Sequence, residues 1–311
     1  MACSCNFLAA FRLVMFSIVF LVCPALVSAL APPPRIVFTD CDGTLLTSSH
    51  ELTPRARSTL ARMKKLGVRV VPATGRARAG RWTQSVLTDP SLESGQPGIY
   101  LNGCSVFNAN GLLQRTVLDA TVVGPVLSFA ATTDGVTAAA YAGDEALVDV
   151  SDALVDDLAA VGDSPVRRVD DLAATCGTLA VSKILLLTSL DGQAQATMRD
   201  ELAPLVKGQA GVTQALPWAI EVVPLGADKA TAAALLLQEW GLEPEAAMAI
   251  GDGENDVPLL KLCGLSVAMA NGAAAAKAAA AHETGSNDDY GWCEAMERFV
   301  IRPIEAAAAA A

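Results

Sequence analysis

Residues 36–46 read Ile-Val-Phe-Thr-Asp-Cys-Asp-Gly-Thr-Leu-Leu, an apolar run that ends in two aspartates and a glycine. The run before Asp40 is rich in β-branched and aromatic residues and predicts a short buried strand. Asp40 and Asp42 follow it directly, and like charges this close raise each other's pKa. Two adjacent like charges do not stabilise a fold, so we expect a bound group to neutralise them.

Strand and helix patterns alternate after this stretch. A helical pattern over residues 53–66 precedes a strand over 68–72, a second helix that ends near residue 87, and a strand over 98–101. This β-α-β-α-β order predicts a parallel sheet with helices on its faces.

The pattern changes near residue 110 and changes back near residue 217. Short strands (138–142, 182–187) and an acidic helix (152–161) predict a separate α+β module between these positions. The first pattern then returns, with expected strands over 220–223, 247–250 and 265–269 and a helix over 229–240. We therefore expect an α/β fold. Its Rossmann-like, parallel-sheet core domain is formed by residues 35–109 and 218–305, and residues 110–217 form an inserted α+β cap domain.

The N-terminus is expected to be a leader. Residues 7–30 are almost wholly apolar, and Val27-Ser-Ala29 offers the small residues that a signal peptidase requires. We expect a signal peptide over residues 1–29, with an uncleaved signal anchor as the alternative because the run approaches the ~20 residues that span a bilayer. The protein would then enter the secretory pathway and be secreted, stay in an endomembrane lumen, or reach a plastid through a two-part leader. A membrane is a partner only if this segment stays uncleaved.

Charge and cysteine content exclude several kinds of function. The 311-residue chain has a formal net charge of −11, so we expect no binding of nucleic acid through its overall field. Two histidines make a histidine-centred mechanism unexpected. Outside the leader, five widely spaced cysteines without a CxxC motif predict buried free thiols: Cys41, Cys104, Cys176, Cys263 and Cys293.

Polar side chains follow the expected strand ends, where ligands bind in doubly wound sheets. Four acids should meet in one crevice there: Asp40, Asp42, Asp252 and Asp256. Such a cluster needs a cation, and Mg²⁺ binds carboxylate oxygens, waters and a substrate phosphate. The sequence therefore predicts a Mg²⁺ site.

These residue types suit phosphoryl transfer. A metal-bound carboxylate can attack phosphorus and form an aspartyl-phosphate. A second carboxylate two positions on shares its face of the strand and can move the protons. Gly43 permits a sharp turn that exposes backbone N–H groups to phosphoryl oxygens. Thr74 offers a hydroxyl and Lys229 a positive charge to the transferred group.

These motifs together resemble the haloacid dehalogenase superfamily. Asp-Cys-Asp-Gly-Thr-Leu-Leu at 40–46 resembles its first motif, Thr74 its second, Lys229 its third, and Gly-Asp-Gly-Glu-Asn-Asp at 251–256 its fourth. Tyr-Leu-Asn-Gly (100–103), Ala-Met-Ala-Asn-Gly (268–272) and Ser-Asn-Asp-Asp-Tyr-Gly (286–291) resemble the Cof-type subclass (IIB). The resemblance covers nearly all of residues 35–300, with the cap matching in placement and size only.

The resemblance assigns a role to each matching residue. Asp40 would be the nucleophile and a Mg²⁺ ligand, and Asp42 the general acid/base, which binds the metal through its backbone carbonyl. Asp252 would be the third protein ligand, and Asp256 would support the metal. The implied phosphate- and substrate-binding residues are Gly43, Thr74, Gly75, Asn102, Lys229, Asn255 and Asn271.

The resulting hypothesis is a Mg²⁺-dependent phosphomonoester hydrolase that acts through an aspartyl-phosphate on a sugar phosphate or a similar small phosphorylated metabolite. A sugar phosphomutase with the same chemistry and a non-catalytic phosphosugar-binding protein are the alternatives. We expect Lys183 to be an edge-strand lysine whose ammonium reaches solvent rather than a phosphate contact. Arg76 fits a phosphate contact and a solvated helix start equally well. The oligomeric state stays open.

Overall fold

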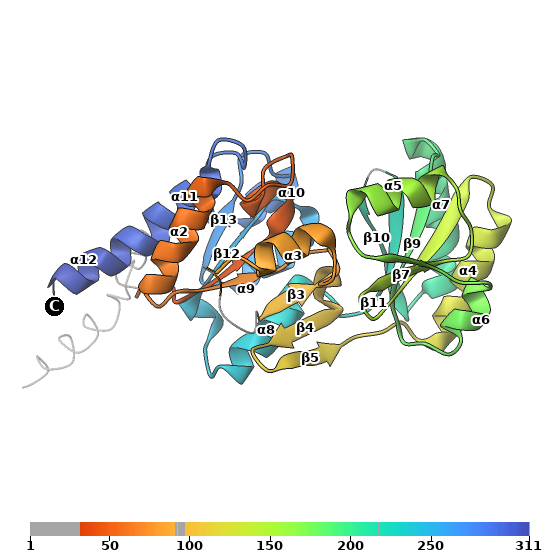
Figure 1. The fold of residues 1–311 in the computed structure, drawn as a ribbon, viewed down its shortest axis with the longest axis horizontal. Helices are drawn as coiled ribbons and strands as arrows, with labels where there is room; N and C mark the ends of the chain where they lie inside the picture. The colour runs from red at the N-terminus through yellow and green to blue at the C-terminus, as the bar shows by residue number, and fades with distance from the viewer. Residues whose placement is uncertain (1–31, 91, 93–96, 217, 311) are drawn as a thin grey trace, which may run out of the picture. The chain divides into compact units, whose positions relative to one another are not determined.

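Three β-sheets and the helices around them make up the described part of the chain, residues 32–90, 92, 97–216 and 218–310 of a computed structural model (Figure 1). The predicted leader, residues 1–29, lies outside these residues, so its cleavage and the secretory route stay predictions. Among the described helices, none combines the length and the apolar character that crossing a bilayer requires.

A five-stranded sheet, parallel throughout, forms the first layer. Val37 of an inner strand packs with one group of buried residues, while Ile36 and Phe38 of the same strand pack with another on the opposite face. Burial on both faces explains why the strands are continuous apolar runs. In spatial order the strands are β14 (His282–Glu283), β13 (Leu265–Ala268), β12 (Ala247–Gly251), β1 (Ile36–Thr39) and β2 (Arg69–Pro72).

Helices cover both faces of the parallel sheet. The α2 and α11 helices lie side by side (Figure 1) and share one apolar cluster with the sheet. Thr53 begins α2, because its hydroxyl accepts a hydrogen bond from the amide of Ala56 at 3.1 Å. The helices around this sheet are α2 (Pro54–Lys65), α3 (Arg81–Leu87), α8 (Lys229–Glu239), α9 (Val257–Leu262), α10 (Ala274–Ala279), α11 (Gly291–Met296) and α12 (Arg302–Ala310).

The third expected parallel strand belongs to a separate three-stranded antiparallel sheet, formed by β3 (Gly98–Tyr100), β4 (Ser105–Asn108) and β5 (Gly111–Arg115). A parallel bridge between Ala73 and Ile99 and a 2.8 Å hydrogen bond from the Thr74 amide to the Ile99 carbonyl link β3 to the end of β2. Leu101 and Asn102 adopt positive φ angles and turn the chain back directly after β3. The turn brings β4 back alongside β3, so β3 pairs with its successor along its whole length and with the end of β2 at one residue pair.

The next sheet has six strands. Residues 220–223 belong to its last strand in chain order, which corrects the prediction that they return to the parallel sheet. That segment pairs with β9 and β10 instead of rejoining the parallel sheet. It forms a hairpin with the preceding strand, a local pairing that composition alone did not reveal, and this sheet therefore extends to Pro224. The domain boundaries at 110 and 217 stay predictions. In spatial order the strands are β10 (Ala210–Leu216), β11 (Ala219–Pro224), β9 (Val181–Thr188), β6 (Val136–Ala142), β7 (Glu145–Val148) and β8 (Val166–Arg168).

The two faces of the six-stranded sheet have different neighbours. On one face, Ile184 and Leu186 pack with residues of α4 and α7, which lie beside each other (Figure 1). On the other, Leu185 and Leu187 pack with α5 and with Leu101. The second face therefore approaches the carboxyl ends of the parallel strands. Its helices are α4 (Ala120–Thr132), α5 (Ala153–Val161), α6 (Leu172–Cys176) and α7 (Gly192–Val206).

Candidate active site

Two adjacent strand ends of the parallel sheet carry the predicted acids. The β1 strand lies between β2 and β12, with Thr39 paired to both Pro72 and Ile250. Asp40 follows β1 directly and Asp252 follows β12 directly. Because neighbouring parallel strands end at the same edge, the two carboxylates come together there.

Three of the four predicted acids form one cluster. One carboxylate oxygen from each of Asp40, Asp252 and Asp256 lies within 4.8 Å of the others. Burial raises the pKa of Asp40 well above its usual value; Lys229 opposes this rise, and the neighbouring acids add to it. The cluster therefore strongly favours a bound cation.

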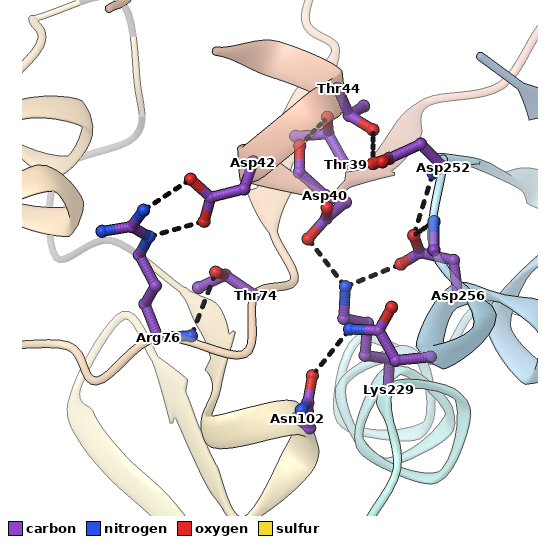
Figure 2. A network of polar contacts seen from close by, with 12 residues as sticks. Thr39, Asp40, Asp42, Thr44, Thr74, Arg76, Asn102, Lys229, Asp252 and Asp256 are labelled. Atoms are coloured by element: carbon purple, nitrogen blue, oxygen red, sulfur yellow. Dashed lines mark hydrogen bonds and ion pairs between the residues drawn. The ribbon is translucent and has the colours of Figure 1, made fainter. Parts of the chain in front are cut away.

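Lys229, the first residue of α8, supplies a positive charge to this cluster (Figure 2). Its ammonium lies 2.7 Å from Asp40 Oδ1 and 2.6 Å from Asp256 Oδ1, and the side chain is fully buried. Burial acts to lower its pKa, but Asp256 and Asp40 outweigh it and raise the pKa above the usual value. The lysine therefore stays charged and bridges the two aspartates.

The turn after β1 requires glycine at position 43. Gly43 has a φ of +71°, and a Cβ there would collide with the Asp252 carboxylate. Thr44 donates a hydrogen bond to Asp252 Oδ1 at 2.8 Å, and Asn271 Nδ2 donates one to the Gly43 carbonyl at 2.8 Å. Asn271 is exposed and contacts this turn, so it holds the loop that carries the acids.

The Asp42 carboxylate lies apart from the other three acids and points toward Arg76 (Figure 2). Arg76 binds it through Nε and Nη2, at 2.5 Å and 2.7 Å, and His50 Nδ1 lies 2.8 Å from Asp42 Oδ1. Arg76 is buried, so the alternative of a solvated helix start is wrong. Sequence reasoning did not place His50 in the site, because a single histidine in a loop carries no motif.

A cavity of about 390 Å³ opens beside these groups. Asn102 receives a 3.0 Å hydrogen bond from Asn255, which connects the loop after β3 with the fourth motif. Thr74 accepts a 3.2 Å hydrogen bond from the Arg76 amide. The predicted site residues that line this cavity are Asp40, Asp42, Gly43, Thr74, Gly75, Asn102, Asp252 and Asn255.

The donor set of the acid cluster fits a hard divalent cation. Carboxylate oxygens of Asp40, Asp252 and Asp256 converge, which is the ligand type that Mg²⁺ prefers. Asp256 is additionally held in place, because its Oδ2 accepts hydrogen bonds from the amides of Asp252 and Gly253 at 3.0 Å and 2.9 Å. Protein oxygens could thus hold an ion at the edge of the cavity.

The structure corrects the prediction for Lys183. Its strand, β9, is an inner strand of the six-stranded sheet, and the ammonium is buried 2.8 Å from Glu221 Oε1. Both residues line the same cavity as Asp40. The signal that could have revealed them is one lysine and one glutamate, each inside an otherwise apolar strand (Val-Ser-Lys-Ile-Leu; Ala-Ile-Glu-Val-Val), because buried charges require a partner.

The five predicted free thiols are buried, and none forms a disulfide within the described residues. Burial, followed by Asp40 and Asp42, raises the pKa of the Cys41 thiol. Cys41 is thus a protonated packing residue between the two acids, in agreement with the prediction for this group of cysteines.

A parallel sheet that presents aspartates and a lysine beside a polar cavity fits an enzyme of the phosphoryl-transfer type. The model of the haloacid dehalogenase-like hydrolases matches residues 37–296. The chain belongs to this family, and it is a phosphatase of the Cof type within it.

Individual relatives share most of the chain's length. A haloacid dehalogenase-like hydrolase from Bacteroides thetaiotaomicron has a solved structure that is 33% identical, with a TM-score of 0.76 over 85% of this chain and 99% of that one. The 5-amino-6-(5-phospho-D-ribitylamino)uracil phosphatase YitU of Bacillus subtilis is 25% identical over 86% of this chain and 97% of its own length. The chloroplastic endoribonuclease YBEY of Arabidopsis thaliana is 30% identical over 87% of this chain, which spans about half (47%) of that protein.

Proposed function

We propose that this protein is a Mg²⁺-dependent phosphomonoester hydrolase that forms an aspartyl-phosphate on Asp40. The observation that carries the proposal is the arrangement of three carboxylates around one point, with a buried lysine bound to two of them and a cavity beside them. A bound Mg²⁺ would neutralise these acids and the charge of the phosphoryl oxygens.

In the first step, one Asp40 oxygen forms a bond to phosphorus as the bond from phosphorus to the ester oxygen breaks. Asp42 gives its proton to the leaving alkoxide. Lys229 and the backbone N–H groups of the turn at Gly43 hold the transferred group, whose charge spreads over its three oxygens.

In the second step, Asp42 takes a proton from a water molecule as that water attacks phosphorus. The bond from phosphorus to Asp40 breaks, inorganic phosphate leaves, and both carboxylates return to their starting forms. The acid/base role requires Asp42 to act from its position at the cavity wall, with the proton on Oδ1 while Oδ2 stays bound to Arg76 Nε.

We propose a small phosphorylated metabolite as the substrate, with a sugar phosphate as the leading class. The cavity is near the lower end of the roughly 300–1,000 Å³ that ligand sites span. Residues of the six-stranded sheet and α5 form part of its wall, and these residues would contact the organic part of the substrate.

The test measures phosphate release by residues 32–311 from a panel of phosphomonoesters, with Mg²⁺ and with EDTA. We expect release that needs Mg²⁺ and that Asp40→Asn abolishes, with a matched Asp200→Asn variant at an exposed position of α7 unaffected. Circular dichroism of both variants verifies the fold. Equal release by wild type and Asp40→Asn would contradict the proposal.

A further inference from the structure

A buried ion pair from the six-stranded sheet lines the cavity that Asp40 and Asp252 also line. Lys183 and Glu221 come from neighbouring strands, β9 and β11, and expose 2% and 3% of their side chains. The strand register pairs Glu221 with Leu185 and Lys183 with Tyr141. Since alternate residues share a face, Lys183 lies diagonally beside Glu221 on the face that lines the cavity.

The pair also contacts the catalytic loops. Lys183 Nζ lies 3.3 Å from the Gly75 carbonyl, and Asn102 Nδ2 lies 3.4 Å from Glu221 Oε2. Both Gly75 and Asn102 line the cavity beside Asp40. Substrate bound at Asp40 would therefore extend toward a wall whose position these contacts fix.

This wall carries one ammonium and two carboxyl groups. Lys183 is its one cation among the described residues that line the cavity from the six-stranded sheet and α5, and Glu221 already binds it. Asp163 adds a second carboxyl group to the wall, and that group accepts a hydrogen bond from the Tyr141 hydroxyl. Burial lowers the pKa of Lys183, but Glu221 and Asp163 outweigh it and raise the pKa, so the lysine stays charged.

A wall of this kind binds hydroxyl groups and repels anions. Carboxylates accept hydrogen bonds from hydroxyls, whereas a second phosphate or carboxylate on the ligand would face two acids and a lysine that is already paired. Like charges brought together at a desolvated interface cost several kcal/mol. Arg76, the other cation at the cavity, is bound to Asp42.

We propose that Glu221, held by Lys183, is the specificity-determining residue of the cavity and selects a neutral, hydroxyl-bearing organic group over one with a second anionic group. This inference rests on the proposed phosphatase function and goes beyond it, because it assigns the discrimination to one side chain. It also distinguishes this protein from an enzyme that works with a sugar bisphosphate.

The experiment compares kcat/KM for the best hexose or pentitol monophosphate with kcat/KM for fructose 1,6-bisphosphate. Wild type should favour the monophosphate by about tenfold or more. Glu221→Gln removes the carboxylate that pairs with Lys183. The preference of this variant for the monophosphate should therefore fall by about tenfold, mainly because its kcat/KM for the bisphosphate rises.

Lys183→Met is the matched control, because it breaks the same ion pair and leaves Glu221 in place. It should lower activity and keep the preference for the monophosphate. Glu221→Asp retains the charge and should also keep the preference, which preserves the test if Glu221→Gln does not fold.

The inference is overturned if wild type prefers the bisphosphate, or if Glu221→Gln and Lys183→Met change both substrates by the same factor. Phenyl phosphate has no second polar group and separates the two proposals. If phenyl phosphate is hydrolysed with Mg²⁺ and Asp40→Asn abolishes this activity, the proposed phosphatase function stands even where the proposed selectivity fails. If neither phenyl phosphate nor any other substrate is hydrolysed, both proposals are overturned.

Discussion

Arg76 holds the Asp42 carboxylate by two hydrogen bonds, Nε to Oδ2 at 2.5 Å and Nη2 to Oδ1 at 2.7 Å. A bidentate pair of this kind fixes the orientation of the carboxyl group. The same guanidinium donates a 3.3 Å hydrogen bond to the carbonyl of Val161, at the end of α5. Arg76 is therefore the positioning residue of the proposed general acid/base.

Replacing Arg76 by lysine should impair proton donation more than binding. Lysine keeps the positive charge but lacks the planar fork, so Asp42 loses its fixed orientation. We expect kcat/KM for an alkyl phosphate to fall about 10- to 100-fold. The value for p-nitrophenyl phosphate should fall much less, because p-nitrophenolate leaves without a proton.

Arg167→Lys, on the exposed β8, is the matched control for that substitution. Since kcat/KM reports the first irreversible step, hydrolysis of the aspartyl-phosphate does not mask the comparison. An equal loss on both substrates would show that Arg76 acts on binding or on the fold and not on the leaving group.

Replacing Lys229 by methionine should destabilise the protein strongly. Asp40 and Asp256 would lose the ammonium that lies 2.7 Å and 2.6 Å from them, and removing one partner of a buried ion pair costs about 3–5 kcal/mol. Urea unfolding without metal measures this loss. Lys261→Met, at an exposed position of α9, serves as control. A loss no larger than in the control would contradict the buried bridge.

The parallel sheet and most of the acid cluster could be predicted because their signals are local. A strand that ends in Asp40 or Asp252 reveals both its direction and its chemistry, and parallel strands end at a common edge. By contrast, the pairing of Lys183 with Glu221 spans 38 residues and depends on strand order. Periodicity does not report strand order, which is also why β11 was assigned to the wrong sheet.

The direction of the Asp42 side chain was equally beyond sequence reasoning. Alternation along a strand predicts the same face for Asp40 and Asp42, but β1 ends at Thr39 and Asp42 lies in the turn formed by Cys41–Leu45. Asp42 therefore meets Arg76, while Asp40 meets Lys229. A backbone that leaves the strand geometry no longer follows the period of two.

Leu236→Ala should expose how much of the stability comes from the packing of α8. Leu236 is fully buried in the cluster between α8, α9 and the parallel sheet. Truncation leaves a cavity there and should cost about 2–5 kcal/mol. Leu225→Ala is the matched control, since Leu225 is 56% exposed and its loss should stay within about 0.5 kcal/mol. Similar values for the two variants, from urea unfolding, would contradict this packing.

Stability should fall as the pH is lowered through the range in which His282 titrates. Burial, and then Arg298, lowers the pKa of His282 from 6.5, so below pH 6.5 the unfolded chain binds this proton more readily than the native one. The contribution is present above about pH 6.5 and is lost as the pH falls toward the native pKa. Urea midpoints from pH 7.5 to 5 should therefore fall more steeply for wild type than for His282→Gln. Parallel curves would contradict the assignment.

Mg²⁺ should stabilise the protein through Asp252. An ion that binds only the native state adds about 2.7 kcal/mol at a concentration 100-fold above its Kd. Asp252 is one of the three carboxylates that converge within 4.8 Å. Asp252→Asn should therefore lose most of this gain and, because the amide removes one of several repelling charges, should unfold less readily than wild type when metal is absent.

Urea unfolding with MgCl₂, and with KCl at the same ionic strength, separates ion binding from screening. Asp200→Asn, at an exposed position of α7, should keep the full gain. EDTA should reverse the gain in wild type and leave Asp252→Asn unchanged. If wild type and Asp252→Asn gained equally from Mg²⁺, the ion would bind elsewhere, and the converging carboxylates would owe their neutralisation to Lys229 alone.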